Sequence, residues 1–275
     1  MNQQQNKPHV LAIASGKGGV GKTNVAVNLA LSLRLFGRKT LLIDADMGLA
    51  NVDVLLGLSL DKDLRDVVLN EVPLDEVVAD GPRGLKILPG ASGVEELANL
   101  GTEKVEGLLE ELDNYCQKFD YVVVDNSPGL APHVIRCLLT ADQILLVTNP
   151  EPSAITDAYA LLKVLSSRQN ARDRTVSVVV NRSESKEEAV RSYDRLRTAA
   201  RRFLEWEVEY LGSVAQDSTV GEASRRQVDF LTHYASSAPS RDVRKIAARL
   251  LSSTDQPEVK VGRFFKTLVE EAPDE

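Results

Sequence analysis

A glycine-rich stretch near the N-terminus, Gly16 to Thr23, constrains this chain more than any other feature. It reads GKGGVGKT and fits G-x-x-x-x-G-K-[S/T], the pattern of a phosphate-binding P-loop. An apolar, strand-like run from His9 to Ala14 precedes it, and a helical pattern from Val25 to Phe36 follows it. The alternative is a glycine-rich turn that binds nothing, and the order strand, loop, helix disfavours that reading. We therefore expect a nucleotide site here.

Each part of the loop has an expected role in binding ATP or ADP. The glycines let the backbone form a nest of N–H donors at the helix N-terminus, where the helix dipole also favours phosphate. Lys22 would lie across the outer phosphates, and the Thr23 hydroxyl would ligate Mg²⁺. The nucleotide-binding residues expected from the loop are Gly16, Lys17, Gly18, Gly19, Val20, Gly21, Lys22, Thr23 and Asn24.

Lys17 is a second cation in the loop, at a position where the P-loop pattern requires none. It is either a solvated surface residue or a group that meets phosphate charge, for example on a nucleotide held by a second subunit. The string K-G-G-x-G-K-T resembles the deviant Walker A motif of the MinD/ParA class of ATPases. In that class the extra lysine reaches across a nucleotide-sandwiched dimer. The resemblance implies a catalytic role for Lys17 and an ATP-dependent homodimer.

Alternating strands and helices predict the fold. Further strand-like runs lie at Lys39–Asp44, Leu85–Leu88, Tyr121–Asp125, Gln143–Thr148, Thr175–Val180 and Tyr210–Val214. Helical stretches lie between most of them, at Thr102–Lys118, Ala131–Leu139, Ala154–Ser167 and Lys186–Phe203. The strands are continuous apolar runs, which is typical when both faces of a sheet are covered. We predict an α/β fold with a doubly wound, mainly parallel sheet and helices on both faces.

Composition and segment boundaries limit the function classes. The formal net charge of −7 argues against a dedicated nucleic-acid binder, so no specific DNA recognition is expected. Cys116 and Cys137 lack metal or redox spacing and are expected to be buried thiols. The N-terminus has no signal-like apolar region and no apolar run is long enough to span a membrane, which predicts a cytoplasmic protein. We expect one P-loop domain, residues 1–253, followed by a connector and tail, residues 254–275.

Two aspartates, Asp44 and Asp46, follow the second strand, at the sheet edge where ligands of open α/β folds bind. In a loop such carboxylates can converge, one orienting a metal-bound water and the other polarising the attacking water. The alternative is a solubilising turn, which the neighbouring P-loop disfavours. In the MinD/ParA class this stretch is switch I. The resemblance implies that Asp44 lies near Mg²⁺ and that Asp46 helps to position the attacking water.

Asp125 ends the apolar run from Tyr121 to Val124, as in a Walker B strand whose carboxylate holds Mg²⁺ through water. Many buried strands end in this way, so the pattern gains weight from its place after a P-loop and an acidic switch. Gly129 would give the following segment, switch II, the freedom to swing an amide toward a γ-phosphate. The expected metal set is Thr23, Asp44 and Asp125.

Two later residues are candidates for the base of the nucleotide. Asn181 follows a strand, and its amide can pair with adenine, although an asparagine at a strand end is also a common turn residue. Asp217 is placed like the loop that flanks the base in the MinD/ParA class. That loop usually carries a proline where Ala215 stands here, which weakens the assignment.

The C-terminal tail carries one apolar stripe at helical spacing, made up of Val261, Phe264, Phe265, Leu268 and Val269. Basic residues border the stripe, and Glu270 and Glu271 follow it. Such a helix suits reversible contact with the inner face of a membrane or docking on the protein's own surface, and the sequence favours neither over the other.

Several strings resemble the FlhG/FleN branch of the class, which sets flagellar number: Asp44 to Leu58, Pro152 to Leu161, and the tail with Phe264 and Phe265. The resemblance runs from Pro8 to Val269. It implies a slow, switch-like ATPase that restrains a transcriptional activator resembling FleQ. The N-terminal segment is too short for the helix by which some relatives stimulate the GTPase FlhF, so FlhF is a secondary candidate partner.

Switch II departs from that branch, because Asp125-Asn126-Ser127-Pro128-Gly129 stands where Asp-Thr-x-Ala-Gly is usual. The departure leaves room for a paralogue with another cargo.

One alternative is a ParA-type partitioning ATPase that acts on DNA, which needs a basic surface. The candidates for it are Arg201, Arg202, Arg225, Arg226, Arg241, Arg244 and Arg249. A metabolic P-loop enzyme or iron–sulfur reductase is a further alternative, but the cysteines do not suit a cluster and no substrate-binding insertion is visible.

Overall fold

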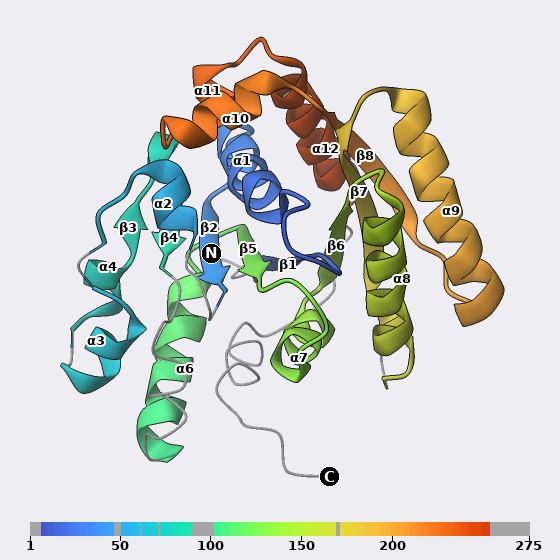
Figure 1. Ribbon diagram of the computed structural model, residues 1–275. Helices are drawn as coiled ribbons and strands as arrows, with labels where there is room; N and C mark the ends of the chain where they lie inside the picture. Colours follow the sequence, from blue (N-terminus) through green and yellow to red (C-terminus); the bar gives the residue numbers. More distant parts are fainter. Residues whose placement is uncertain are drawn as a thin grey trace.

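A twisted sheet runs through the centre of the molecule, with helices packed on both of its faces (Figure 1). The structure is a computed structural model and describes residues 7–46, 51–60, 62–70, 72–89, 102–168 and 171–253, without the side chains of residues 65, 68, 102–106 and 253. Within these residues the sheet has eight strands in the order β3-β4-β2-β5-β1-β6-β7-β8. The strands are β1 (His9–Ala14), β2 (Thr40–Ala45), β3 (Ala79–Asp80), β4 (Lys86–Leu88), β5 (Tyr121–Asn126), β6 (Gln143–Thr148), β7 (Thr175–Ser183) and β8 (Glu209–Ala215). All pairs are parallel except the short edge pair β3 and β4.

Helices connect the strands and extend the chain beyond the last one. They are α1 (Lys22–Leu35), α2 (Val52–Leu56), α3 (Leu64–Leu69), α4 (Leu74–Val77), α6 (Thr102–Cys116), α7 (Pro132–Thr140), α8 (Pro152–Ser166), α9 (Lys186–Leu204), α10 (Ser218–Arg225), α11 (Phe230–His233) and α12 (Ala238–Ser253). Two 3₁₀ turns, η1 (Pro82–Gly84) and η2 (Ala171–Asp173), complete the described elements.

The core consists of two apolar layers, one on each face of the sheet. Successive strand residues point to opposite faces, so Val10 and Ala12 pack with α6 to α9, whereas Leu11 and Ile13 pack with α1, α11 and α12. Every one of these strand side chains is fully buried. Both faces are therefore dry, which explains the continuous apolar runs of the strands.

The predicted fold class is confirmed. The predicted strands and the five predicted helices are all present, with ends that differ by at most three residues. The expected burial of Cys116 and Cys137 is confirmed as well, and both thiols are free. No helix within the described ranges is long and apolar enough to cross a membrane. The expected tail helix, with its stripe from Val261 to Val269, lies outside the described residues.

Candidate functional site

Three neighbouring strands bring the predicted site residues to one edge of the sheet. The P-loop follows β1, Asp44 stands near the end of β2, and Asp125 near the end of β5. The parallel register places Asp44 directly beside Asp125 and aligns Asp125 with Ile13 of β1. Because the carboxyl ends of parallel strands meet at one edge, residues far apart in sequence converge there.

The loop conformation depends on glycine at particular positions. Gly21, with φ of 88°, and Gly19, with φ of 80°, adopt the left-handed conformation that side chains rarely tolerate. Gly21 is the N-cap of α1, which begins at Lys22, so the free N–H groups of the first turn face the loop. Gly16 is needed for a different reason, because a Cβ there would lie 2.2 Å from the backbone of Asp157 in α8. The loop is thus fixed against α8.

Lys22 makes a buried ion pair at the centre of the site. Its Nζ lies 2.6 Å from Oδ1 of Asp125, and the two side chains are 6% and 1% exposed. The Thr23 side chain also hydrogen-bonds the Asp125 carboxylate. Burial raises the pKa of Asp125, and the Lys22 ammonium opposes that rise. The three residues expected to serve phosphate and metal therefore contact one another directly.

Asp44 fixes the ends of the segment that follows β2. Its Oδ1 accepts a hydrogen bond from the backbone N–H of Asp46 at 3.1 Å. Its Oδ2 accepts from the N–H groups of Asn51 and Val52 at 2.9 and 3.1 Å, at the start of α2. Burial raises the pKa of Asp44 to about 6, the Asp125 carboxylate adds to the rise, and the three N–H donors oppose it. Asp44 is therefore a structural anchor for switch I, a role that the sequence pattern did not predict.

Asp46 contacts switch II through a serine. The Ser127 hydroxyl donates a hydrogen bond to Oδ1 of Asp46 at 2.9 Å. The neighbouring Asn126 points the other way, since its buried amide donates to the backbone oxygens of Ile13 and Val124. Gly129, with φ of 100°, donates its N–H to the backbone oxygen of Ser15 at 2.9 Å. The divergent switch II sequence thus places one residue in the core and one hydroxyl on Asp46.

Lys17 contacts the beginning of α8 at the surface. Its Nζ lies 2.8 Å from Oε2 of Glu151 and 2.9 Å from Oγ of Ser153. The Lys17 side chain is 31% exposed and that of Glu151 is 59% exposed. The ammonium holds the pKa of Glu151 below its usual range. Lys17 is therefore separate from Lys22 and has acidic and hydroxyl partners of its own.

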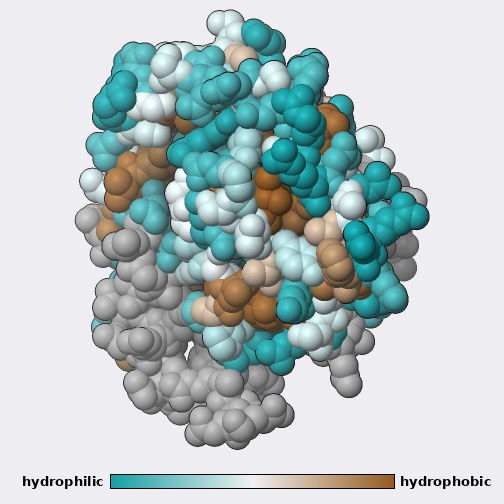
Figure 2. Space-filling model, turned by 45° about the vertical axis from the view of Figure 1, so that its right-hand side comes forward, coloured by the Kyte–Doolittle hydropathy of each residue, from teal (hydrophilic) through white to brown (hydrophobic). Residues whose placement is uncertain are grey.

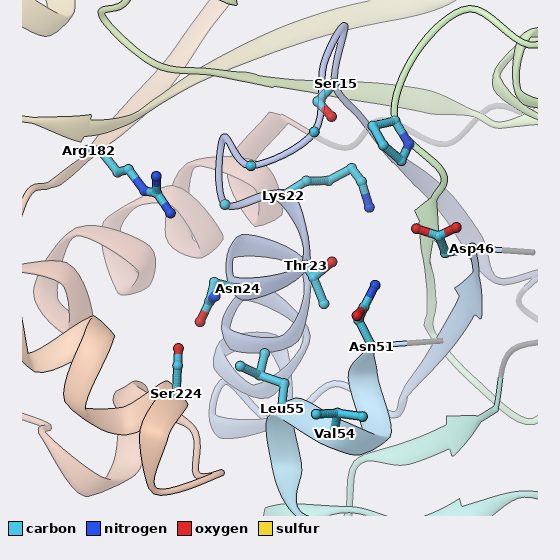
Figure 3. A pocket seen from close by; sticks show the side chains of 14 residues that line it. Ser15, Lys22, Thr23, Asn24, Asp46, Asn51, Val54, Leu55, Arg182 and Ser224 are labelled. Carbon is cyan, nitrogen blue, oxygen red and sulfur yellow. The ribbon is translucent and has the colours of Figure 1, made fainter. Parts of the chain in front are cut away.

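Asn181 and the residue after it lie on the other side of the loop. The Asn181 amide donates to the backbone oxygen of Val20 at 2.8 Å, and a Cβ on Gly21 would meet its nitrogen at 2.3 Å. Asn181 therefore holds the loop in place. Arg182, which sequence analysis missed, lines the pocket from the side opposite Asp46 (Figure 3). The sequence feature that could have identified Arg182 is its position directly after Asn181.

A pocket of about 740 Å³ opens over the loop. Figure 3 shows Lys22, Thr23 and Asp46 directed toward the same space. The lining residues are Ser15, Gly18, Gly19, Gly21, Lys22, Thr23, Asn24, Asp46, Asn51, Val54, Leu55, Pro128, Arg182 and Ser224. Sequence analysis missed Val54, Leu55 and Ser224, which lie on α2 and α10, and Asn51, which caps α2, because it did not predict these two helices.

Asp217 is not among the residues that line this pocket. It is the N-cap of α10, and its Oδ1 accepts hydrogen bonds from the N–H and hydroxyl of Thr219 at 2.9 and 2.7 Å. These two donors lower the pKa of Asp217. The structure thus gives Asp217 a capping function, and its expected contact with a base stays a prediction.

The donor set fits magnesium and a nucleoside phosphate. The amide-rich loop at the start of α1 and the buried Lys22 ammonium suit phosphate oxygens. The Thr23 hydroxyl and the Asp125 carboxylate, already in contact, are oxygen ligands of the kind that Mg²⁺ prefers. Within the described residues no cluster of three or more histidine, cysteine or acidic side chains suits a metal held by protein alone. A metal shared with phosphate, as is usual for Mg²⁺, is consistent with that finding.

Comparisons with known proteins agree with this geometry. A family model described as an AAA domain matches residues 8–178. Antiactivator FleN of Pseudomonas aeruginosa is 40% identical over 218 residues, which cover 79% of this chain and 77% of that protein. The flagellum site-determining protein YlxH of Helicobacter pylori is 32% identical, with 94% of this chain and 89% of that protein covered. Among solved structures, the septum site-determining protein MinD of Pyrococcus horikoshii complexed with Mg-ADP is 25% identical, with a TM-score of 0.71, and the match covers 90% of this chain and 98% of that one.

The loop with its two lysines, the sheet order and these similarities converge on one assignment. The chain belongs to the MinD/ParA class of P-loop ATPases and, within it, to the branch of FleN and FlhG.

Proposed function

We propose that this chain is an ATP-dependent dimerising switch that regulates flagellar number or placement by restraining a FleQ-like transcriptional activator. The similarity to an antiactivator over most of the chain supports the regulatory role. The observation that carries the switch itself is the separation of the two loop lysines. Lys22 is buried on Asp125, whereas Lys17 is at the surface on Glu151 and Ser153, so one can serve the nucleotide while the other remains accessible to a second subunit.

The side chains of this chain divide the work of binding and hydrolysis. Lys22 would exchange the Asp125 carboxylate for phosphate oxygens, which frees Asp125 to hold Mg²⁺ together with Thr23. When bound, Mg²⁺ neutralises charge that develops on the phosphate oxygens. Asp46, oriented by the Ser127 hydroxyl, would position the attacking water. Asp44 keeps the Asp46 backbone in place through its hydrogen bond to the N–H.

The alternative, a ParA-type ATPase that acts on DNA, needs a basic surface, and most of the arginines that would form it have structural partners. Arg241 and Arg244 donate to backbone oxygens of Ser236 and Ala235, and Arg249 donates to that of Leu211. Arg201 pairs with Glu207. The three guanidinium groups that hold backbone oxygens are committed to the fold, which leaves fewer arginines for a DNA backbone and favours the regulatory proposal.

The proposal is tested by counting flagella in cells that carry variants of this chain, with purified protein as a biochemical readout. Asp46→Ala should slow hydrolysis and keep the dimer state, so these cells should carry fewer flagella and the purified variant should bind the activator with ATP. Lys17→Ala should bind ATP, fail to dimerise and give extra flagella, as a deletion would. Unchanged flagellar number in both variants, combined with ATP-dependent and salt-sensitive binding to a DNA duplex, would support the DNA-acting alternative instead.

A further inference from the structure

Helix α9 carries a basic groove on its solvent face, away from the nucleotide pocket. The groove has a volume of about 530 Å³ and is lined by Arg191, Asp194, Arg195, Thr198, Ala199, Arg202 and Phe203. These residues recur at intervals of three, four and seven and therefore share one side of the helix. The opposite side, which includes Leu196 and Ala200, is buried on the sheet. None of the groove residues lines the nucleotide pocket.

The arginines of this groove differ from their neighbours on the same helix. Arg197 and Arg201 lie 3.4 and 3.3 Å from the carboxylate of Glu207 and form ion pairs with it. In the described part of the chain, by contrast, Arg191 and Arg195 make no hydrogen bond or ion pair. Two exposed guanidinium groups one helical turn apart are thus available to a partner, in a protein whose net charge is −7.

An aromatic ring lies at one end of the groove. Phe203 is 66% exposed, the most exposed of the large hydrophobic side chains in the described residues. The guanidinium of Arg202 lies 5.3 Å from the centre of its ring. Arginine and exposed aromatic residues are the types enriched at the energetic centres of protein interfaces. In Figure 2 the side of the molecule that carries α9 comes forward, and its mainly hydrophilic surface is interrupted by separate hydrophobic patches.

These observations together favour a protein ligand over a polyanion. A nucleic acid would bring a continuous run of phosphates against Asp194 in the middle of the groove, whereas a protein ligand carries separate charges and can place an uncharged side chain there. An anionic membrane would bring a plane of negative headgroups against the same Asp194. An amphipathic helix can place carboxylates on Arg191 and Arg195 and an apolar side chain on Phe203, because both helices repeat every turn.

We infer that the α9 groove is a docking site for an acidic amphipathic helix of a partner protein, and that it binds this helix whether ATP or ADP is present. Two carboxylates one turn apart on the partner pair with Arg191 and Arg195. The partner's apolar side chain covers the ring of Phe203. Because the groove shares no residue with the nucleotide pocket, docking there leaves the switch free to operate. The site goes beyond the proposed switch and does not depend on it.

The test starts from a phage-displayed library of helical peptides, each of about 20 residues so that the helix is stable, selected on the intact protein. Enriched peptides should carry acids one turn apart beside an apolar residue. Their binding, measured by fluorescence anisotropy, should fall about tenfold or more in the double variant Arg191→Gln, Arg195→Gln and should be equal with ATP and ADP. The matched control is Arg197→Gln, Arg201→Gln, which removes the same charge from the same helix and should leave binding within about twofold.

A second pair of variants isolates the apolar contact. Phe203→Ser should weaken the peptide, whereas Val190→Ser, at another exposed apolar position of α9, should not. Circular dichroism and ATP hydrolysis, unchanged in all these variants, show that the protein is folded. Three results would overturn the inference: enriched peptides that lack acids, equal binding to the two arginine double variants, or displacement of the peptide by a DNA duplex or by phosphatidylglycerol vesicles at equal charge concentration.

Discussion

Two lysines of the same loop contact carboxylates in opposite environments. The Lys22–Asp125 pair has side chains that are 6% and 1% exposed, whereas those of the Lys17–Glu151 pair are 31% and 59% exposed. The distances between the charged atoms are nearly the same, 2.6 and 2.8 Å. Distance alone therefore does not separate the two contacts, but access to water does.

The difference in burial gives the two contacts different strengths. Removing one partner of a buried pair leaves an uncompensated charge, which typically costs about 3–5 kcal/mol. An exposed pair is screened by water and is easily exchanged for another partner. A loop with one lysine of each kind can hold a nucleotide tightly and still release its second lysine to a neighbouring subunit.

The largest effect is expected from the buried lysine. Lys22→Ala should abolish measurable ATP binding, a loss of about a hundredfold or more, because the buried cation next to Asp125 is lost and Arg182 lines the opposite side of the pocket. Isothermal titration calorimetry measures this, with Lys17→Ala as the control that should keep its affinity within about threefold. Similar affinity losses in the two variants would remove the contrast between the lysines.

The pH dependence of stability should also separate buried from exposed carboxylates. Burial raises the pKa of Asp44 to about 6, above the ordinary value of 3.8, so the folded state holds this proton more tightly than the unfolded state does. The contribution of Asp44 to the free energy of unfolding is then present below about pH 4 and is lost as the pH rises through about 6. This contribution is about 3 kcal/mol at most. Asp44→Asn should remove this dependence in chelator-treated, nucleotide-free protein.

Glu151→Gln is the exposed counterpart in the same experiment. Lys17 lowers the pKa of Glu151 in the wild-type protein. The contribution of Glu151 to stability is therefore present above its ordinary pKa and is lost as the pH falls through the lowered value. Denaturant unfolding of the two variants and the wild-type protein between about pH 3 and 8 gives both slopes. Slopes of the same sign for Asp44 and Glu151 would contradict the role assigned to burial.

A smaller effect is expected from the hydroxyl that orients Asp46. Ser127→Ala should lower kcat for ATP hydrolysis about three- to tenfold while the affinity for ATP stays unchanged, because one hydrogen bond to a carboxylate is lost. Ser127→Thr keeps the hydroxyl and should restore most of the rate. An equal loss in both variants would indicate a steric role for Ser127 rather than a hydrogen bond.

Local patterns predicted the elements of this fold well, because each pattern reports on its own segment. The continuous apolar run of β5 indicated a sheet covered on both faces. The loop glycines indicated a helix directly after them, predicted from Val25 and observed from Lys22. The short helices α2 and α10 were not predicted, since runs of five and eight residues are too short to show a clear period.

The contacts that define the site join residues far apart in sequence. Lys17 meets Glu151 across 134 positions, and Ser127 meets Asp46 across 81. Only the strand order and the parallel register bring such residues together, so no local pattern predicts them. The anchoring role of Asp44 was hidden for a different reason, because two of its partners are backbone groups at the start of the unpredicted helix α2.

Sedimentation velocity with ATP tests the division of labour between the two lysines most directly. The protein with Asp46→Ala should sediment as a dimer, because the water-positioning carboxylate is gone while the phosphate contacts remain. The double variant Lys17→Ala, Asp46→Ala should bind one ATP per chain and sediment as a monomer. A double variant that is fully dimeric with ATP would contradict the assignment of Lys17 to the second subunit.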